Sequence, residues 1–148
     1  MKLLVVDYDG VIADSQLEGL FSGFNTYLEF NKQTKLFGSE KFTFNNFNSK
    51  LKTYKKTFDK YKNLRPFLVD AFSYYVMMHI LENSLKVKNQ NTFNKLRDNL
   101  KNKFYYKYFN SIYKFRKNLQ KTHLNEWLNL QKPYSKILSK LKKLYTFL

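Results

Sequence analysis

Two aspartates one residue apart are the side chains of this sequence that best suit catalysis. Asp7 and Asp9 follow the apolar run Leu3–Val6, and Gly10 comes directly after them. A continuous β-branched run of this kind is typical of a strand buried on both faces of a parallel sheet. Alternate side chains of an extended backbone point to the same side, so both carboxylates would lie at the carboxyl end of that strand, where open α/β sheets bind ligands.

Two carboxylates held in this way suit two kinds of chemistry. One can act as nucleophile while the other gives and takes a proton, or both can face a divalent cation. Gly10 permits a sharp turn and leaves room for a phosphate near its backbone N–H. The Asp-Gly pair between apolar flanks is also typical of a two-residue β-hairpin. A plain hairpin gives no reason for Asp7 inside its first strand, so the sequence favours a functional role and leaves the hairpin open.

The residues from Leu4 to Ser15 resemble the first motif of the haloacid dehalogenase superfamily, in the form Asp-x-Asp-Gly-x-x-x-Asp-Ser that its phosphatases carry. The resemblance implies that Asp7 attacks phosphorus to form an aspartyl-phosphate. Asp9 would protonate the leaving oxygen, later activate water, and contact the phosphate together with Gly10. Mg²⁺ would bind the Asp7 carboxylate and the Asp9 backbone carbonyl. Because the dehalogenase branch lacks the second aspartate, the substrate expected is a small phosphorylated molecule.

A second segment, from Pro133 to Leu148, is similar to the part of these phosphatases that returns from a helical cap to the core. Its apolar residues recur at helical spacing from Ile137 to Tyr145, which predicts an amphipathic helix. Residues 145–148 would begin the next strand and lie parallel to the first. No residue matches the family's later motifs: a phosphate-binding Thr or Ser, a Lys and an acidic pair. The resemblance therefore predicts a truncated or split amino-terminal half, with doubtful activity by itself.

The expected fold class is α/β, with a partial Rossmann-like core and a large inserted helical cap, in a chain that is mostly helical. Residues 1–15 would form the first strand and the catalytic loop, 16–131 the cap, and 132–148 the return helix and the start of the next core strand. Four glycines and two prolines are few interruptions for 148 residues, which favours long helices. A half-built sheet would need a complementing chain or a second copy of this one as a partner.

Helical spacing of apolar residues locates the first elements of the cap. A helix is expected from 16 to about 31, capped by Asp14 or Ser15. The apolar residues on one face of it are Leu17, Leu20, Phe21, Phe24, Tyr27 and Leu28. A polar, aromatic-rich loop is expected over 33–48, and a basic helix over 50–61.

A later helix is expected to open at Arg65-Pro66, because proline suits the first helical turn. Its buried side chains would be Leu68, Phe72, Tyr75, Val76, His79 and Ile80. Further apolar side chains continue at helical spacing, and these are Phe93, Leu96, Leu100, Phe104, Tyr108, Ile112, Phe115, Leu119, Trp127 and Leu128.

The strong positive charge, +16 at pH 7, raises an alternative function. The chain would then be a basic helical module that binds nucleic acid non-specifically, or a protein, with a vestigial motif. Lysines among aromatic residues, as in 101–109, suit a phosphate backbone and stacked bases. Arg65, Arg97 and Arg116 are the only arginines among 27 basic residues, and the lysines are spread along the chain. Specific recognition of nucleic acid is therefore not expected, whereas salt-sensitive, non-specific binding is.

Arg65 is the remaining candidate for the site, because a cation at the start of a cap helix can close over an anionic substrate. The alternative is an ordinary solvated arginine, and Arg116 is a candidate on the same terms. His79 and His123 have no paired acids and are expected to pack or to face solvent. The chain has no cysteine, no apolar segment long enough to span a membrane and no signal peptide. A cytoplasmic location is therefore expected.

Overall fold

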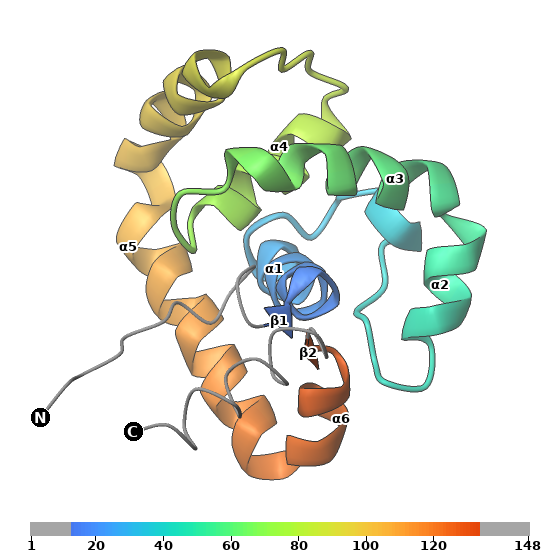
Figure 1. Ribbon diagram of the computed structural model, residues 1–148. Coiled ribbons are helices and arrows are strands. Elements are labelled where there is room, and N and C mark those ends of the chain that lie inside the picture. Colours follow the sequence, from blue (N-terminus) through green and yellow to red (C-terminus); the bar gives the residue numbers. More distant parts are fainter. Residues whose placement is uncertain (1–12, 134–148) are drawn as a thin grey trace, which may run out of the picture.

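The computed structural model describes residues 13–133, and within them the chain is mostly helical (Figure 1). The central helix α1 is seen nearly end-on in Figure 1, and α4 and α5 pack against it. The helices of this part of the chain are α1 (Gln16–Phe30), α2 (Phe47–Thr53), α3 (Lys55–Leu64), α4 (Ser73–Glu82), α5 (Gln90–Thr122) and α6 (Leu124–Asn129), with 3₁₀ turns at Leu36–Gly38 and Arg65–Phe67.

The expected α/β fold class is wrong. The only strands within residues 13–133 are β1 (Ala13–Asp14) and β2 (Lys132–Pro133), which have two residues each and pair antiparallel. A Rossmann-like core needs several buried parallel strands, whereas the apolar residues of this region recur at helical spacing and build helices. The segments expected to pair as parallel strands, Leu3–Val6 and Tyr145–Leu148, lie outside the described residues, as does the helix expected from Ile137.

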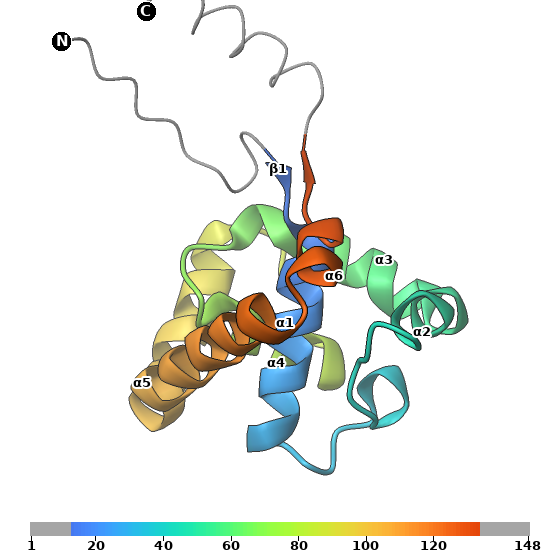
Figure 2. The same cartoon turned by 90° about the horizontal axis from the view of Figure 1, so that it is seen from below.

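The two ends of the described chain meet in a short antiparallel pair. Ala13 lies opposite Pro133, and Asp14 lies opposite Lys132. We call these four residues the stem, and Figure 2 shows it at one side of the helical body. The chain therefore enters and leaves the body at one place, next to the domain boundaries that the sequence predicts after residues 15 and 131.

Helix α1 forms the centre of the core as its sequence pattern predicts. Ser15 is the N-cap residue of α1 but makes no side-chain cap hydrogen bond, whereas the preceding Asp14 carboxylate accepts from the Gln16 N–H at 3.0 Å. The predicted apolar face is confirmed, because five of its six members are buried and the sixth, Leu17, is partly buried. The buried members are Leu20, Phe21, Phe24, Tyr27 and Leu28.

The segment between α1 and α2 is a loop, as expected, but its phenylalanines complete the core. Phe42 packs its ring 4.7 Å from Phe24 and 4.8 Å from Phe47. The buried Asn25 side chain holds the loop in place: it accepts from the Phe42 N–H at 2.7 Å and donates to the Phe42 carbonyl at 2.9 Å. Both backbone groups of Phe42 are thus satisfied away from water, which allows an irregular segment to be buried.

The single basic helix expected over 50–61 is two helices, because α2 ends and α3 begins around Tyr54. Tyr54 has φ −103° and ψ 36°, outside the helical region. Its ring packs 6.1 Å from Phe37, and Lys50 donates to the Phe37 carbonyl at 3.1 Å. These contacts with the preceding loop set the angle between the helices, and no glycine or proline marks the break in the sequence.

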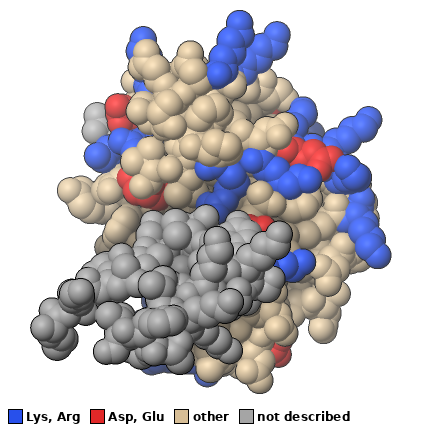
Figure 3. Space-filling model, viewed as in Figure 1, with Lys and Arg blue, Asp and Glu red and all other residues tan. Residues whose placement is uncertain are grey.

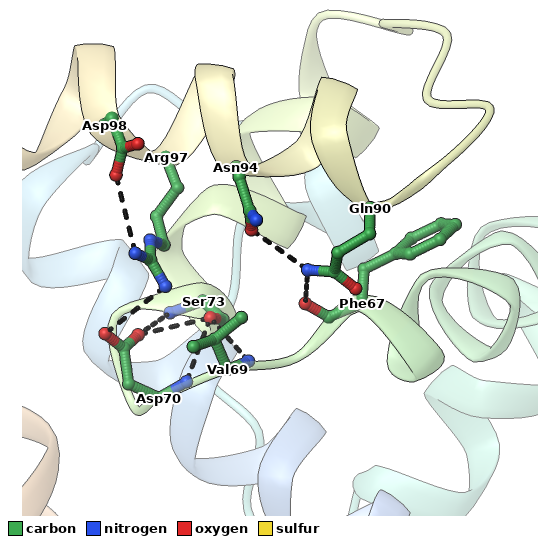
Figure 4. A network of polar contacts seen from close by, with 8 residues as sticks. All are labelled: Phe67, Val69, Asp70, Ser73, Gln90, Asn94, Arg97 and Asp98. Carbon is green, nitrogen blue, oxygen red and sulfur yellow. Dashed lines mark hydrogen bonds and ion pairs between the residues drawn. The ribbon is translucent and has the colours of Figure 1, made fainter.

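Helix α4 begins at Ser73 and not at Arg65-Pro66, which forms only a 3₁₀ turn. Figure 4 shows the reason. The Asp70 carboxylate accepts from the Ser73 N–H at 3.0 Å, and Ser73 Oγ accepts from the N–H of Val69 and of Asp70. Arg97 of α5 lies 3.9 Å from Asp70 and links the two helices. A reciprocal cap of this kind starts a helix more firmly than a proline does.

The end of α4 is closed by a Schellman motif whose left-handed residue is a serine. Leu85 N–H donates to Ile80 and Ser84 N–H to Leu81, and Ser84 has φ 50°. A side chain in this region costs about 1 kcal/mol, which glycine avoids. We therefore expect Ser84→Gly to raise the free energy of unfolding by about 1 kcal/mol in urea denaturation. If Ser84→Gly does not raise the free energy of unfolding, and Ser84→Ala is as stable as the parent, the serine at this cap is not strained.

Helices α1 and α4 cross closely because α1 has glycines one turn apart. A side chain at Gly19 would meet the Tyr74 ring at 2.5–2.7 Å, and one at Gly23 would meet the Tyr74 Cβ at 2.9 Å. Tyr108 of α5 donates to the Gly23 carbonyl at 2.9 Å from the other side. The apolar residues expected at helical spacing after residue 90 form one continuous helix, α5, and then α6. Leu128 is the exception to the expected burial, since it is 44% exposed.

Candidate functional site

Five polar side chains gather beside the stem, and we call them the stem cluster: Ser15, Glu18, Arg65, Tyr74 and Arg116. Arg65 lies in the 3₁₀ turn before α4, and its Nη2 donates to Ser15 Oγ at 3.1 Å. Its Nη1 donates to the Tyr74 hydroxyl at 2.9 Å. Ser15 is the last residue of the aspartate motif, so Arg65 lies at the point where the motif joins the helical body.

Arg116 reaches the cluster from α5 and forms a two-pronged ion pair with Glu18. Its Nε donates to one carboxylate oxygen at 2.9 Å and its Nη2 to the other at 2.7 Å. Ser22 donates to the same carboxylate at 2.6 Å. Burial by itself would lower the pKa of Arg116, but attraction to Glu18 outweighs it and the pKa is raised. The Glu18 side chain is only 4% exposed, so this pair is held away from water.

The Tyr74 ring lies within about 6 Å of both guanidinium groups. The guanidinium carbon of Arg65 is 5.8 Å from the ring centre, and that of Arg116 is 5.5 Å away. Cations at these distances over an aromatic face are attracted by its electrons. Tyr74 therefore holds both side chains in position, and the absent side chain of Gly19 leaves space for its ring.

The cluster brings two guanidinium groups and one carboxylate to the end of the body at which the motif ends. Glu18 neutralises Arg116 through two parallel hydrogen bonds. Arg65 contacts two hydroxyl groups within the described chain. A planar guanidinium can present two donors to phosphate oxygens, and the hydroxyls beside it can donate as well. The stem cluster thus carries one more positive than negative charge beside the end of the motif.

A second acid, the partly buried Glu82, joins the far ends of α1 and α4. Its carboxylate accepts from Tyr27 and from Asn31, each at 2.5 Å. Burial, together with the hydrogen bond to Glu82, raises the pKa of Tyr27 above its ordinary value. Every group named here has a partner in the neighbouring helix, so this cluster holds α1 and α4 together and offers no open site.

The structure places only part of the site that the sequence predicts. Asp7, Asp9 and Gly10 lie outside the described residues. Arg65 is in the stem cluster as described, and Arg116 lies within it as the partner of Glu18.

The histidines lie away from the stem cluster, as expected. His79 is partly buried, and burial lowers its pKa. Its ring stacks at 6.5 Å on Tyr75. His123 is exposed, with its ring 5.4 Å from Phe44. Both therefore pack or face solvent.

The described residues add no ligand set for a metal ion. Within residues 13–133, no three His, Asp or Glu side chains lie close enough together to hold one. The Asp14 carboxylate accepts a backbone N–H, and Glu18 is taken by Arg116. Residues 13–133 therefore hold no ready set of three ligands for a magnesium ion.

Sequence reasoning missed Glu18 and Tyr74, although the sequence carries a signal for the first. Glu18 falls on the apolar face of α1, next to Leu17 and one position before Gly19. A carboxylate on a buried face must be paired, so its position indicated a cationic partner elsewhere in the chain. Nothing in the sequence pointed to Arg116 as that partner, because the two residues are joined only by the packing of α5 on α1.

Lysines and arginines on the face seen in Figure 3 are distributed over several elements and project from its upper and right-hand parts. This agrees with the sequence, in which the basic residues do not form one block. Among the helices of residues 13–133, none has the length and apolar character needed to cross a membrane.

The comparisons with known proteins add no relative. No family model matches the chain, and neither the curated proteins nor the solved structures include a similar protein. A functional interpretation therefore depends on the aspartate motif and on the geometry of the stem cluster.

Proposed function

We propose that this chain belongs to a phosphohydrolase that acts on small phosphorylated molecules, with Asp7 as its nucleophile. The observation that carries the proposal is the contact between Arg65 and Ser15. It joins a phosphate-binding type of side chain to the last residue of a motif whose acids suit phosphoryl transfer. The residues of the motif and their spacing, Asp-x-Asp-Gly-x-x-x-Asp-Ser, support the same reaction.

In the proposed reaction the two acids of the motif have different roles. Asp7 attacks phosphorus and carries the phosphoryl group as a carboxylic-phosphoric anhydride. Asp9 gives its proton to the leaving oxygen and then removes a proton from the water that releases phosphate. Gly10 permits close approach of the phosphate to the backbone. Mg²⁺, when bound, would supply positive charge at the phosphoryl oxygens.

The helical body acts in this proposal as a cap. The stem supports the role, because a body that begins and ends at one place can be inserted between two other segments. Arg65 would then contact the anionic substrate from the cap side. The sequence does not contain residues that match the later motifs, so we propose that a further polypeptide supplies a phosphate-binding hydroxyl, a lysine and further acids. We also propose that the protein acts in the cytoplasm.

The proposal predicts that Asp7→Asn abolishes hydrolysis of an aryl phosphate by this chain when it is combined with the polypeptide that completes the site. By itself the chain should show no magnesium-dependent turnover above background, because each missing electrostatic contact is worth on the order of 3 kcal/mol. Together with the polypeptide encoded directly downstream of Leu148, it should turn over substrate. Asp59→Asn, an exposed aspartate of α3, is the matched control and should leave the rate unchanged. Turnover that persists in Asp7→Asn would reject Asp7 as the nucleophile.

A further inference from the structure

Helix α5 exposes large aromatic side chains to solvent on the side that faces away from the core. Tyr106 is 78% exposed and Tyr113 is 49% exposed, while Tyr108 and Ile112 on the inner side are fully buried. Exposed aromatic rings in one place are uncommon on a protein surface unless they meet a partner.

The exposed tyrosines belong to a continuous row of rings, which we call the aromatic strip: Tyr105, Tyr106, Phe109 and Tyr113. Neighbouring ring centres in the strip are 5.2 Å apart for Tyr105 and Tyr106, 5.9 Å for Tyr105 and Phe109, and 4.7 Å for Phe109 and Tyr113. Each ring is supported by the next, so the strip is ordered before any partner arrives. Over the eight-residue step from Tyr105 to Tyr113 it spans roughly 12 Å of helix.

Positive charge accompanies the strip. Lys101 Nζ lies 4.7 Å from the centre of the Tyr105 ring, and Lys114 and Lys117 are exposed beside Tyr113. Asp98 is the only acidic residue in the sequence of α5, and it precedes the strip by two turns. A partner that lies along the strip therefore meets aromatic faces and ammonium groups and no carboxylate of this helix.

We propose that the outer face of α5 binds single-stranded nucleic acid without sequence preference. Unpaired bases stack on Tyr106 and Tyr113, while Lys101, Lys114 and Lys117 contact the phosphates. Three features favour this partner. The face is basic, its apolar groups are rings and not aliphatic side chains, and lysines in place of arginines suit contact with phosphates without reading of bases. The binding does not depend on the proposed phosphohydrolase reaction.

The test measures binding of the full chain to a fluorescent oligothymidylate of about 20 nucleotides by anisotropy, over a range of salt concentrations. Three phosphate contacts predict a slope of roughly −2 for the logarithm of the binding constant against that of salt. The double variant Tyr106→Ser with Tyr113→Ser should weaken binding by at least about tenfold, because stacking on each ring is lost. The duplex of the same length should bind more weakly than the single strand, since its bases are not free to stack.

The matched control is Leu124→Ser with Leu128→Ser, because these α6 side chains are 50% and 44% exposed and lie outside the strip. This control should bind like the parent, and circular dichroism should show equal helix content in all three proteins. Equal affinity in the tyrosine variant and the parent would overturn the proposal. Tighter binding of the duplex than of the single strand would mean that only charge attracts nucleic acid to this surface. That result would also overturn the proposal. Self-association that the tyrosine variant abolishes, without nucleic-acid binding by the parent, would assign the strip to a protein interface instead.

Discussion

Arg116→Met is expected to lower the free energy of unfolding by about 3–5 kcal/mol. The change removes both hydrogen bonds to Glu18, whose side chain is 4% exposed. The carboxylate then stays in the core with only Ser22 as a donor among the described residues, and an unpaired buried charge is costly. Small domains are stable by about 5–15 kcal/mol, so this loss is a large fraction of the total. Urea denaturation followed by circular dichroism measures it.

Two further variants separate burial of the charge from loss of packing. Glu18→Met combined with Arg116→Met should recover most of the stability, because two apolar side chains of similar size can replace a buried pair. Lys55→Met breaks an exposed ion pair with Asp59, in which the lysine side chain is 75% exposed. This variant should cause no measurable change in the free energy of unfolding. If the double variant is as unstable as Arg116→Met, the loss comes from packing and the buried charge is not its cause.

Gly19→Ala is expected to destabilise the protein by about 2 kcal/mol, although alanine is the better helix former by about 1 kcal/mol. The added Cβ would come within 2.5–2.7 Å of the Tyr74 ring and hydroxyl. Tyr74 is 3% exposed and is held by Arg65, so its ring has little room to move away. The expected sign is therefore opposite to that given by helix propensity alone.

The control for Gly19→Ala is Asn110→Ala, on the exposed side of α5. There the gain in helix propensity, which is smaller for Asn→Ala than for Gly→Ala, should appear as an increase in stability of a few tenths of a kcal/mol. Both variants are compared by urea denaturation. If Gly19→Ala also raised the free energy of unfolding, helices α1 and α4 would not be in close contact at this glycine.

The helices were predictable where the apolar pattern alone decides them. Phe21, Phe24 and Tyr27 lie on the predicted face of α1, and α5 follows the spacing from Phe93 to Leu119. The break at Tyr54 depends on contacts with Phe37, which is distant in sequence, so no local signal announces it. The start of α4 follows the Asp-x-x-Ser pattern at 70–73, whose side chains bond to the backbone of the first turn, and not the proline at 66.

The α/β expectation failed for a different reason. It extended the property of one apolar run, Leu3–Val6, to an architecture that requires several strands. The antiparallel stem joins Asp14 to Lys132, and pairing over such a separation leaves no mark in the local sequence. Of the candidate site, Arg65 is a candidate from the sequence because it is a cation at the expected start of a helix, and its role in a site stays a prediction. Its contact with Ser15 depends on the folded body, so the local sequence does not announce it.

The most direct test of the proposed function is to identify the residue that carries the phosphoryl group. The chain, together with the polypeptide encoded downstream of Leu148, is mixed with Mg²⁺ and an aryl phosphate, quenched in acid and analysed by peptide mass spectrometry. The proposal predicts a phosphoryl adduct on Asp7. The adduct should disappear in Asp7→Asn. With an aryl phosphate whose phenol is acidic enough to leave without a proton from Asp9, it should accumulate in Asp9→Asn, because the second step needs Asp9 as a base. Turnover with no adduct, or with an adduct on another residue, would contradict it.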